Sequence, residues 1–170
     1  MVITGGEPTL HEGLFRFAER LKARGIKVKL DTNGSNPAVL KDLAAAGLVD
    51  YIAMDMKGPV ASYKRWCGVD ADVPRIEESI DFLLAGAVDY EFRMTVVPFL
   101  HREEDVYEAA ERIKTCRRFF IQEFRSDHTL NPAFAHIRPF TPHKMTRIRE
   151  HVAAILRRST GKPELENRER

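Results

Sequence analysis

Charged side chains recur at the ends of short apolar segments along this chain, or within them, and their types suggest what they could bind. A charge that is buried without a partner is costly, so each must reach solvent, a neighbouring group or a ligand. Carboxylates and basic groups that meet at one place suit a ligand with both an ammonium and a carboxylate, as in an amino acid. The charged positions are Glu7, Asp31, Asp55, Lys57, Arg93 and Arg125.

The apolar segments that carry these charges predict β-strands, and the segments between them predict helices. Any one of the charges alone could be a solvated loop residue or a helix cap, but their recurrence over five consecutive segments favours a shared ligand site. We expect strands over residues 1–4, 25–30, 51–54, 90–97 and 118–124. We expect helices over residues 11–24, 37–46, 73–85, 103–114 and 142–158.

Strands that alternate with helices predict a parallel α/β sheet. A complete eight-unit barrel takes about 250 residues, so a chain of this length holds about five βα units. The sequence therefore predicts either an open doubly wound sheet or an incomplete barrel, and in both the ligand lies at the carboxyl ends of the strands. We expect one domain over residues 1–158 and a charged, frayed tail over 159–170.

The composition excludes several classes of partner. The formal net charge is +2, from 27 Lys and Arg against 25 Asp and Glu, which is too balanced to indicate a nucleic acid or an acidic membrane surface. No apolar run approaches the roughly 20 residues that span a bilayer, and no signal peptide opens the chain. We therefore expect a cytoplasmic protein that binds neither nucleic acid nor membrane.

Cysteines and histidines give no sign of a metal site within the chain. The two cysteines, Cys67 and Cys116, are far apart and lack the spacing of metal ligands. Four histidines could be metal ligands, but they show no close pairing at helical spacing, so we predict that they are surface or loop residues. These histidines are His101, His128, His136 and His143.

The segment Gly5-Gly6-Glu7-Pro8 follows an expected strand and precedes an expected helix. It resembles the Gly-Gly-Glu-Pro motif of the radical S-adenosylmethionine (SAM) enzymes. The segments that follow it, 30–34 and 54–57, occur in an order similar to that of the branch that activates glycyl radical enzymes. The resemblance covers about residues 2–132.

Three later segments indicate which activating proteins the chain resembles most. Residues 93–98 (Arg-Met-Thr-Val-Val-Pro), 121–125 (Ile-Gln-Glu-Phe-Arg) and 129–132 (Thr-Leu-Asn-Pro) look most like the activating proteins of anaerobic ribonucleoside-triphosphate reductase. The resemblance implies the partial (β/α)6 barrel of radical SAM proteins and a [4Fe–4S] cluster on three cysteines. It also implies cleavage of SAM to a 5′-deoxyadenosyl radical, which takes a hydrogen atom from a glycine of the partner reductase. Flavodoxin or ferredoxin is the expected electron donor.

The resemblance also implies roles for the motif residues. The turn at Gly5 and Gly6, with Glu7, would hold the SAM amino group, because glycines let the backbone approach closely and a carboxylate accepts from an ammonium. Pro8 would stiffen that turn. Asp31 corresponds to an acid near the amino end of SAM.

The remaining roles carry over in the same way. Asn33 belongs to the same cofactor-binding set, although Asn33-Gly34 could be only a tight turn. Asp55 would face the ribose hydroxyls or a monovalent cation, and Lys57 would pair with the SAM carboxylate. Arg93 corresponds to a basic residue near SAM, whereas Arg125 stands where some relatives carry a histidine.

The chain departs from the family in one place. The cluster motif C-x-x-x-C-x-x-C precedes the Gly-Gly-Glu-Pro strand in the family, and only four residues precede Gly5 here. We therefore expect a barrel that lacks its first βα unit and cluster loop, in a chain that is a fragment and is inactive alone. Two alternatives stay open: another radical SAM enzyme, similar to a 7-carboxy-7-deazaguanine synthase, and a non-catalytic remnant that binds SAM or a partner.

Overall fold

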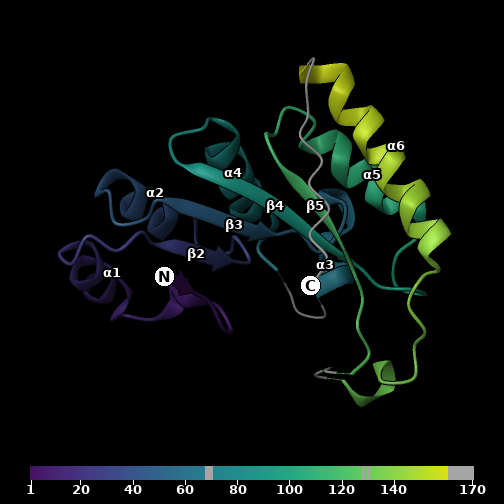
Figure 1. Ribbon diagram of the computed structural model, residues 1–170, viewed down its shortest axis with the longest axis horizontal. Helices are drawn as coiled ribbons and strands as arrows, with labels where there is room; N and C mark the ends of the chain where they lie inside the picture. The colour runs from purple at the N-terminus through teal and green to yellow at the C-terminus, as the bar shows by residue number, and fades with distance from the viewer. Residues whose placement is uncertain (68–70, 128, 130, 161–170) are drawn as a thin grey trace. The chain divides into compact units, whose positions relative to one another are not determined.

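The computed structural model describes residues 1–67, 71–127, 129 and 131–160 (Figure 1). Of the tail expected over 159–170, residues 159–160 belong to the last helix, so the helix runs two residues further than predicted. Residues 161–170 and His128 lie outside the described residues. The strands are β1 (Val2–Ile3), β2 (Lys29–Thr32), β3 (Tyr51–Asp55), β4 (Asp89–Val96) and β5 (Phe119–Glu123). The α-helices are α1 (Leu14–Lys22), α2 (Pro37–Ala45), α3 (Tyr63–Cys67), α4 (Val73–Leu84), α5 (Glu103–Arg112) and α6 (Pro142–Thr160). Single 3-10 turns are η1 (Pro8–Leu10), η2 (Val60–Ser62) and η3 (Pro132–Phe134).

The strand order distinguishes between the two architectures that the sequence allowed, a doubly wound sheet and an incomplete barrel. The sheet runs β1-β2-β3-β4-β5, so each strand lies beside the next one in sequence. The first three strands pair in parallel, with Val2 opposite Lys29 and Lys29 opposite Tyr51. A doubly wound sheet reverses its strand order at an internal strand, and this order does not reverse. The fold is therefore that of a partial, barrel-type α/β sheet.

The chain divides into two compact units. The first comprises Met1–Asp55 with Val69–Phe92, and the second comprises Met56–Gly68 with Arg93–Arg170.

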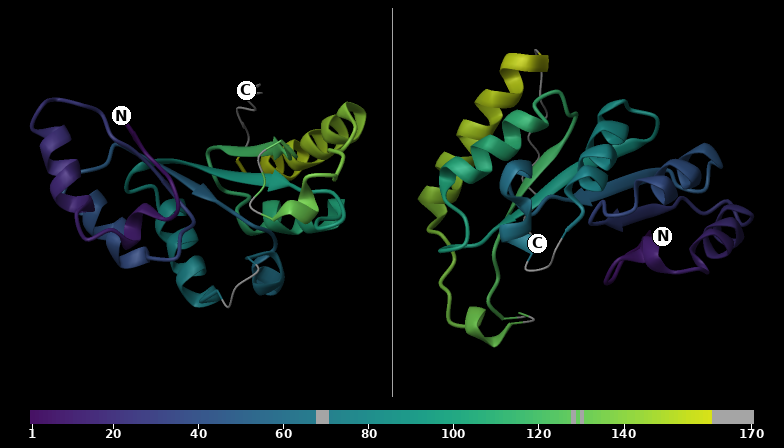
Figure 2. Two further views of the ribbon diagram at one scale, coloured as in Figure 1. Left: turned by 90° about the horizontal axis from the view of Figure 1, so that it is seen from below. Right: turned by 180° about the vertical axis from the view of Figure 1, so that it is seen from behind.

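In the first unit, helices cover one face of the parallel strands. Figure 2 shows α1, α2 and α4 on the same side of β2 and β3. Successive side chains of a strand point to opposite faces, and in β2 Leu30 and Thr32 are buried whereas Lys29 and Asp31 are half-buried. The core beneath the helices contains Leu14, Ala18, Leu21, Leu30, Leu40, Leu43, Ile52, Ile76, Ile80 and Leu83.

In the second unit, α5 and α6 lie side by side (Figure 1). The ring of Tyr107 in α5 stacks on His151 in α6, with 4.0 Å between ring centroids. At the start of α5, Glu103 pairs with Arg147 and Lys144 of α6. The hydrogen bond from Arg147 is the main cause that lowers the pKa of Glu103. Ion pairs and a ring stack thus join two helices that are some 40 residues apart in sequence.

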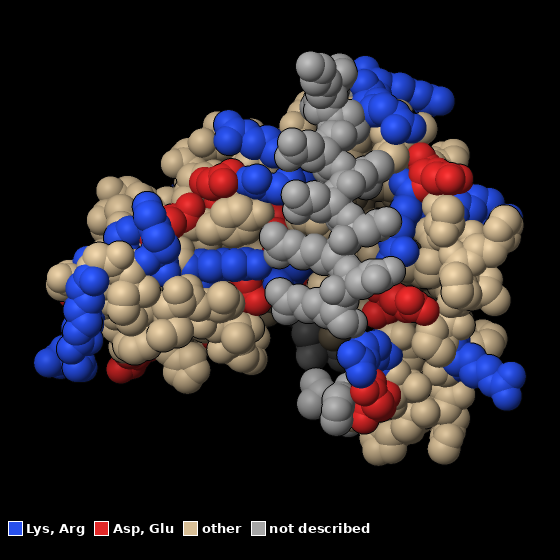
Figure 3. All heavy atoms as spheres, viewed as in Figure 1, with Lys and Arg blue, Asp and Glu red and all other residues tan. Residues whose placement is uncertain are grey.

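One face of the molecule carries charges of both signs. On the face drawn in Figure 3, basic and acidic side chains are interspersed. Among the described residues, no helix combines the length and apolar character needed to cross a membrane.

Several element boundaries differ from the prediction: the second strand starts at Lys29 and not at residue 25, and two further differences have a clear physical cause. The second strand was expected to stop at residue 30, but β2 continues through Asp31 and Thr32, which pair with Ala53 and Met54 of β3. The first helix was expected from residue 11, but it begins at Leu14. The preceding residues form η1, whose N-terminus is capped by the Glu7 side chain. Long-range pairing and a side-chain cap therefore set these boundaries, rather than local periodicity.

Asp50 links the starts of two strands in the first unit. Its carboxylate accepts from Val28 N–H at 2.7 Å, from Lys22 Nζ at 2.8 Å and from Lys27 Nζ at 3.0 Å. Burial raises the pKa of Asp50, but the hydrogen bonds from Lys22, Val28 and Lys27 outweigh burial and hold that pKa well below its usual range.

Asp50→Asn is therefore expected to destabilise the protein at neutral pH and to lose this effect in acid. A carboxyl with a pKa lowered by folding stabilises the fold above the unfolded pKa of about 3.9. That contribution is lost as the pH falls through the folded pKa. Urea denaturation at about pH 7 and about pH 3 measures the stability difference between wild type and variant, which should shrink at the lower pH. An unchanged difference would contradict the expectation.

Candidate functional site: the loops at the carboxyl ends of the strands

The turn after β1 depends on two glycines. Gly5 has φ +103° and Gly6 has φ +50°, both in the left-handed region that side chains disfavour. A Cβ atom on either residue would meet no atom within 4 Å. The requirement for glycine is therefore one of backbone conformation, and the space beside this turn is open.

Glu7 follows this turn and is buried, with 9% of its surface exposed. Its Oε1 accepts from the Thr9 hydroxyl at 2.6 Å, from Thr9 N–H at 3.0 Å and from the Thr32 hydroxyl at 2.9 Å. Its Oε2 accepts from Asn33 N–H at 2.6 Å. The carboxylate therefore anchors the glycine turn to the end of β2, an interaction that the sequence did not predict.

Hydrogen bonds and a close contact also fix the turn at the end of β2. The side-chain oxygen of Asn33 accepts from Ser35 N–H at 2.8 Å. Gly34 has φ +76°, and a Cβ there would lie 2.2 Å from the Met54 Cε atom. The Ser79 hydroxyl donates to the Gly34 carbonyl at 2.7 Å. Asn33 and Gly34 thus form the tight turn that their types predict, and Asn33 also binds Glu7 through its backbone.

The two predicted aspartates of the first unit share one face of the sheet. Asp31 lies opposite Ala53 in the parallel register, and Asp55 lies two residues beyond Ala53 on the same face. Both aspartates are half-buried. Parallel strands bring their carboxyl ends to one edge, so this unit places Asp31 and Asp55 at the edge that also carries the Gly5 turn.

A charged network lies nearer the start of the same strands. Lys29 Nζ is 3.0 Å from Glu91 Oε1 and 3.8 Å from Asp31 Oδ1. Tyr51 donates its hydroxyl to Glu91 Oε2 at 2.8 Å. Glu91 is 1% exposed, so its carboxylate is stabilised by these partners within the fold. The sequence prediction singled out Asp31 but not Lys29, Tyr51 or Glu91.

The second unit contains the three predicted basic residues. Lys57 is exposed, and its backbone N–H donates to the Tyr63 hydroxyl at 3.1 Å. Arg93 is half-buried in β4, and its carbonyl accepts from Met56 N–H at 2.7 Å. Arg125 is exposed and forms a forked hydrogen bond to Asp127, with distances of 2.7 and 3.3 Å. The structure therefore pairs Arg125 with a neighbouring carboxylate.

His101 lies in the loop between β4 and α5, in line with the expected surface or loop position, but it is not at the surface, because only 5% of it is exposed. Its ring stacks on Trp66, with 4.8 Å between centroids. Burial lowers the pKa of His101, and the hydrogen bond to the Lys57 carbonyl opposes that shift. No local pattern marks its burial, because Lys57 and Trp66 come from other segments of the chain. His136 and His143 are exposed, as expected.

The cysteines of the second unit differ in burial. Cys116 is buried, and burial raises its pKa to about 12. Burial also raises the pKa of Cys67, and the positive charge of Lys57 opposes that shift. A cluster on three thiolates needs three cysteines, and the chain has two. The residues of this chain therefore do not fit a [4Fe–4S] cluster by themselves.

SAM fits the residues of this chain better than the cluster does. SAM is an amino acid joined to a nucleoside, so it offers an ammonium, a carboxylate and ribose hydroxyls to charged side chains. The exposed glycine turn leaves room for close approach to the backbone. The half-buried carboxylates of Asp31 and Asp55 lie at the same edge. The ammonium of Lys57 is exposed in the second unit.

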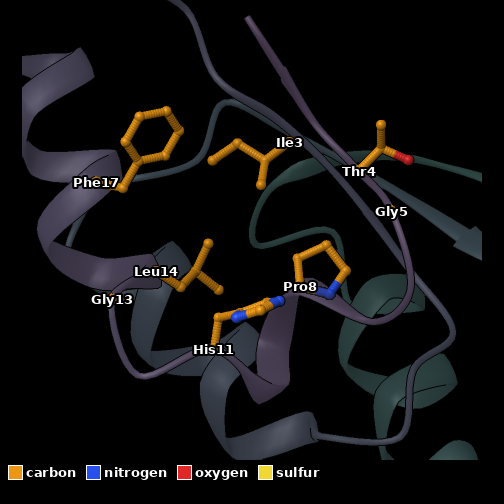
Figure 4. Close-up of a pocket in the computed structure, with 8 residues that line it drawn as sticks. All are labelled: Ile3, Thr4, Gly5, Pro8, His11, Gly13, Leu14 and Phe17. Carbon is orange, nitrogen blue, oxygen red and sulfur yellow. The ribbon is translucent and has the colours of Figure 1, made fainter.

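A hollow of about 250 Å³ lies in the first unit, between the end of β1 and α1. Figure 4 shows Ile3, Leu14 and Phe17 around it, with Pro8 and His11 below. Its lining is mainly apolar and contains no carboxylate, lysine or arginine. This hollow therefore lacks the charges that a zwitterionic ligand needs.

Residues 1–114 match the family model described as the radical SAM superfamily. The chain belongs to this superfamily. It is 34% identical over 139 residues to a Methanocaldococcus jannaschii protein whose name proposes a glycyl-radical enzyme activating enzyme. That alignment covers 79% of this chain and 58% of the relative, so the chain spans little more than half of its length.

Other proteins match this chain over shorter stretches or in fold alone. The 7-carboxy-7-deazaguanine synthase of Neisseria meningitidis is 38% identical over 84 residues, which cover 49% of this chain and 36% of the synthase. A crystallised domain of a pyruvate-formate lyase-activating enzyme from Bacteroides vulgatus has a TM-score of 0.72 at 16% identity. The match covers 91% of this chain and 93% of that domain, and it supports the radical SAM fold.

Proposed function

We propose that this chain is the SAM-binding part of a radical SAM protein that activates a glycyl radical enzyme. The observation that carries this proposal is the extent of the match to the M. jannaschii protein, which covers 79% of the chain. Matches to three 7-carboxy-7-deazaguanine synthases cover only 49–53% of the chain. The activating-enzyme relative therefore shares more of this chain.

Within the first unit, the glycine turn and the two aspartates take the amino and ribose parts of SAM. The backbone at Gly5 and Gly6 approaches the amino group, while Glu7 and Pro8 keep the turn in shape. Asp31 and Asn33 lie at the amino end, and Asp55 faces the ribose hydroxyls. The arrangement of these residues at one strand edge supports this assignment.

Within the second unit, Lys57 binds the SAM carboxylate as an ion pair, and Arg93 adds positive charge. Arg125 has a smaller role, since Asp127 already binds its guanidinium. In the family, bound SAM together with a cluster supplies the 5′-deoxyadenosyl radical. The cysteines for such a cluster must come from outside this chain.

The proposed partner is a glycyl radical enzyme, and more narrowly an anaerobic ribonucleoside-triphosphate reductase. The segments 93–98 and 121–125 support the narrower choice through their resemblance to the activating proteins of that reductase. The electron donor would be a flavodoxin or a ferredoxin, and the site of action the cytoplasm.

A second candidate function is that of a 7-carboxy-7-deazaguanine synthase. Three such proteins are 38–40% identical to about half of this chain. A glycyl radical signal on a partner reductase, recorded by electron paramagnetic resonance with the complete gene product, supports the activating enzyme. Absence of that signal, with turnover of the synthase substrate, would favour the second candidate.

The gene itself offers the first test of the proposal. Reading upstream of the Met1 codon in frame is expected to show a strand followed by C-x-x-x-C-x-x-C within about 30–60 residues, the length of one or two βα units. A stop codon or an unrelated sequence there would contradict the activating enzyme and favour a non-catalytic remnant.

SAM is expected to bind this chain weakly, with a Kd of about 1 mM, because no cluster iron contributes. Lys57→Met should weaken binding about tenfold, since it removes an ion pair worth about 1.4 kcal/mol. Amide chemical-shift titration measures both constants, with Lys64→Met as the matched control that removes another exposed charge. Equal affinity in wild type and Lys57→Met would overturn the role of Lys57, and micromolar binding by wild type would favour the remnant.

A further inference from the structure

The backbone of Lys57 is held on both sides by side chains of the second unit. Its N–H donates to the Tyr63 hydroxyl at 3.1 Å, and its carbonyl lies 2.8 Å from His101 Nε2. Tyr63 is 1% exposed and His101 is 5% exposed, whereas the Lys57 side chain is exposed. Two buried groups therefore fix the backbone at the base of an exposed side chain.

The hydrogen bonds of His101 determine its tautomer. Nδ1 accepts from Val97 N–H at 3.0 Å, so Nδ1 carries no proton. The proton of the neutral ring then lies on Nε2, which donates it to the Lys57 carbonyl. The two ring nitrogens thus have different roles, because Nδ1 holds the loop after β4 and Nε2 holds Lys57.

Trp66 completes this arrangement. Its indole stacks on the His101 ring at 4.8 Å between centroids, and its Nε1 donates to the Ser62 hydroxyl at 3.1 Å. A Cβ atom on Gly58 would lie 2.3 Å from Trp66 Cδ1, so the residue after Lys57 must be glycine for the indole to stay in place. We call Tyr63, Trp66 and His101 the Lys57 clamp.

We propose that His101 is a positioning residue, which acts through the Lys57 carbonyl to aim the Lys57 ammonium at the carboxylate of the bound ligand. This inference rests on the proposed function, in which Lys57 binds the SAM carboxylate. A lysine ammonium is a point charge on a long flexible stem. Fixing the backbone at its root restricts where the ammonium can reach, and the buried clamp supplies that restriction without touching the ligand.

A purely structural role would use the other ring nitrogen, because the bond from Val97 to Nδ1 shapes only the loop after β4. Two substitutions separate these roles. In His101→Asn the amide oxygen can take the place of Nδ1 and keep the Val97 bond, but no donor reaches the Lys57 carbonyl. In His101→Gln the longer amide can place its NH2 where Nε2 lies and keep the bond to Lys57.

The experiment uses the full chain and two readouts by nuclear magnetic resonance. Amide hydrogen exchange at Lys57 reports on the clamp without any ligand. Titration with SAM gives the Kd. His101→Asn is expected to speed exchange at Lys57 about tenfold and to weaken SAM binding about fivefold, whereas His101→Gln stays within about twofold of wild type in both.

The opposite order, in which the Gln variant is affected and the Asn variant is not, overturns the inference and leaves His101 a structural residue. Unchanged exchange at Lys57 in the Asn variant overturns it as well. If His101→Asn fails to fold, Tyr63→Phe tests the Lys57 clamp instead, because this change removes the hydroxyl that accepts from the Lys57 N–H. It should also speed exchange at Lys57 and weaken SAM binding, and unchanged values would contradict the clamp.

Lys57→Met separates failure of the inference from failure of the proposed function. If Lys57→Met leaves the Kd unchanged, the proposed contact between Lys57 and SAM is wrong and the inference falls with it. If Lys57→Met weakens binding but His101→Asn does not, the proposed contact stands and the positioning role of His101 is overturned.

Discussion

Glu7→Ala is expected to lower the free energy of unfolding by about 4 kcal/mol, because it leaves buried donors without their acceptor. The carboxylate accepts four hydrogen bonds, from Thr9, Thr32 and Asn33, and only 9% of Glu7 is exposed. Hydrogen bonds to a charged group contribute about 1.5–3 kcal/mol each, although such contributions are not additive. Urea denaturation followed by circular dichroism measures the change.

Two further variants test the cause. Glu7→Gln keeps the volume and one oxygen but turns an NH2 group towards one of the donors, so it should destabilise by about half as much. Glu19→Gln, on the exposed surface of α1, is the control and should change stability by less than about 0.5 kcal/mol. If Glu7→Ala behaves like the control, the anchoring role of Glu7 is wrong.

Lys29→Met is expected to destabilise the protein by about 3 kcal/mol, because it removes the ion pair between Lys29 and the buried Glu91 carboxylate. Glu91 is 1% exposed and lies 3.0 Å from Lys29 Nζ. Asp31, at 3.8 Å, loses the same positive charge. The hydrogen bond from the Tyr51 hydroxyl remains, but it supplies no full charge to balance the carboxylate.

The double variant Lys29→Met with Glu91→Gln provides the decisive comparison. A neutral amide at position 91 can still accept from Tyr51, so the double variant should recover to within about 1 kcal/mol of wild type. Lys27→Met removes a lysine that is 86% exposed and should change stability by less than about 1 kcal/mol. A double variant no more stable than Lys29→Met would show that the lost interaction is packing and not charge.

Local sequence patterns were enough to predict the order of the elements. The expected helices over residues 73–85 and 103–114 match α4 and α5 to within two residues. The pair Gly5-Gly6 indicated a turn, and its two positive φ angles agree with that expectation. Such features depend on residues close together in the chain, so they can be read without the rest of the fold.

Features set by distant residues could not be read in this way. Asp31 was expected after its strand and lies within it, because pairing with β3 decides where β2 ends. The ion pair of Glu91 with Lys29 could not be predicted from local sequence, since the two residues are 62 positions apart. His101 was expected at the surface or in a loop; it lies in a loop, but contacts with Lys57 and Trp66 bury it. The positions of Lys57 and Arg93 were singled out from motifs, and their roles towards SAM stay predictions.

The hydrogen bonds of Glu7 have a consequence for the thermodynamics of ligand binding. They join the glycine turn to Thr32 and Asn33, which lie 25 and 26 residues further along the chain. The turn is therefore held in shape by the protein before any ligand arrives. A ligand that contacts Gly5 or Gly6 loses little ordering entropy there, because the backbone is already preorganised. The entropy of binding should then change little when a substitution stiffens this loop further.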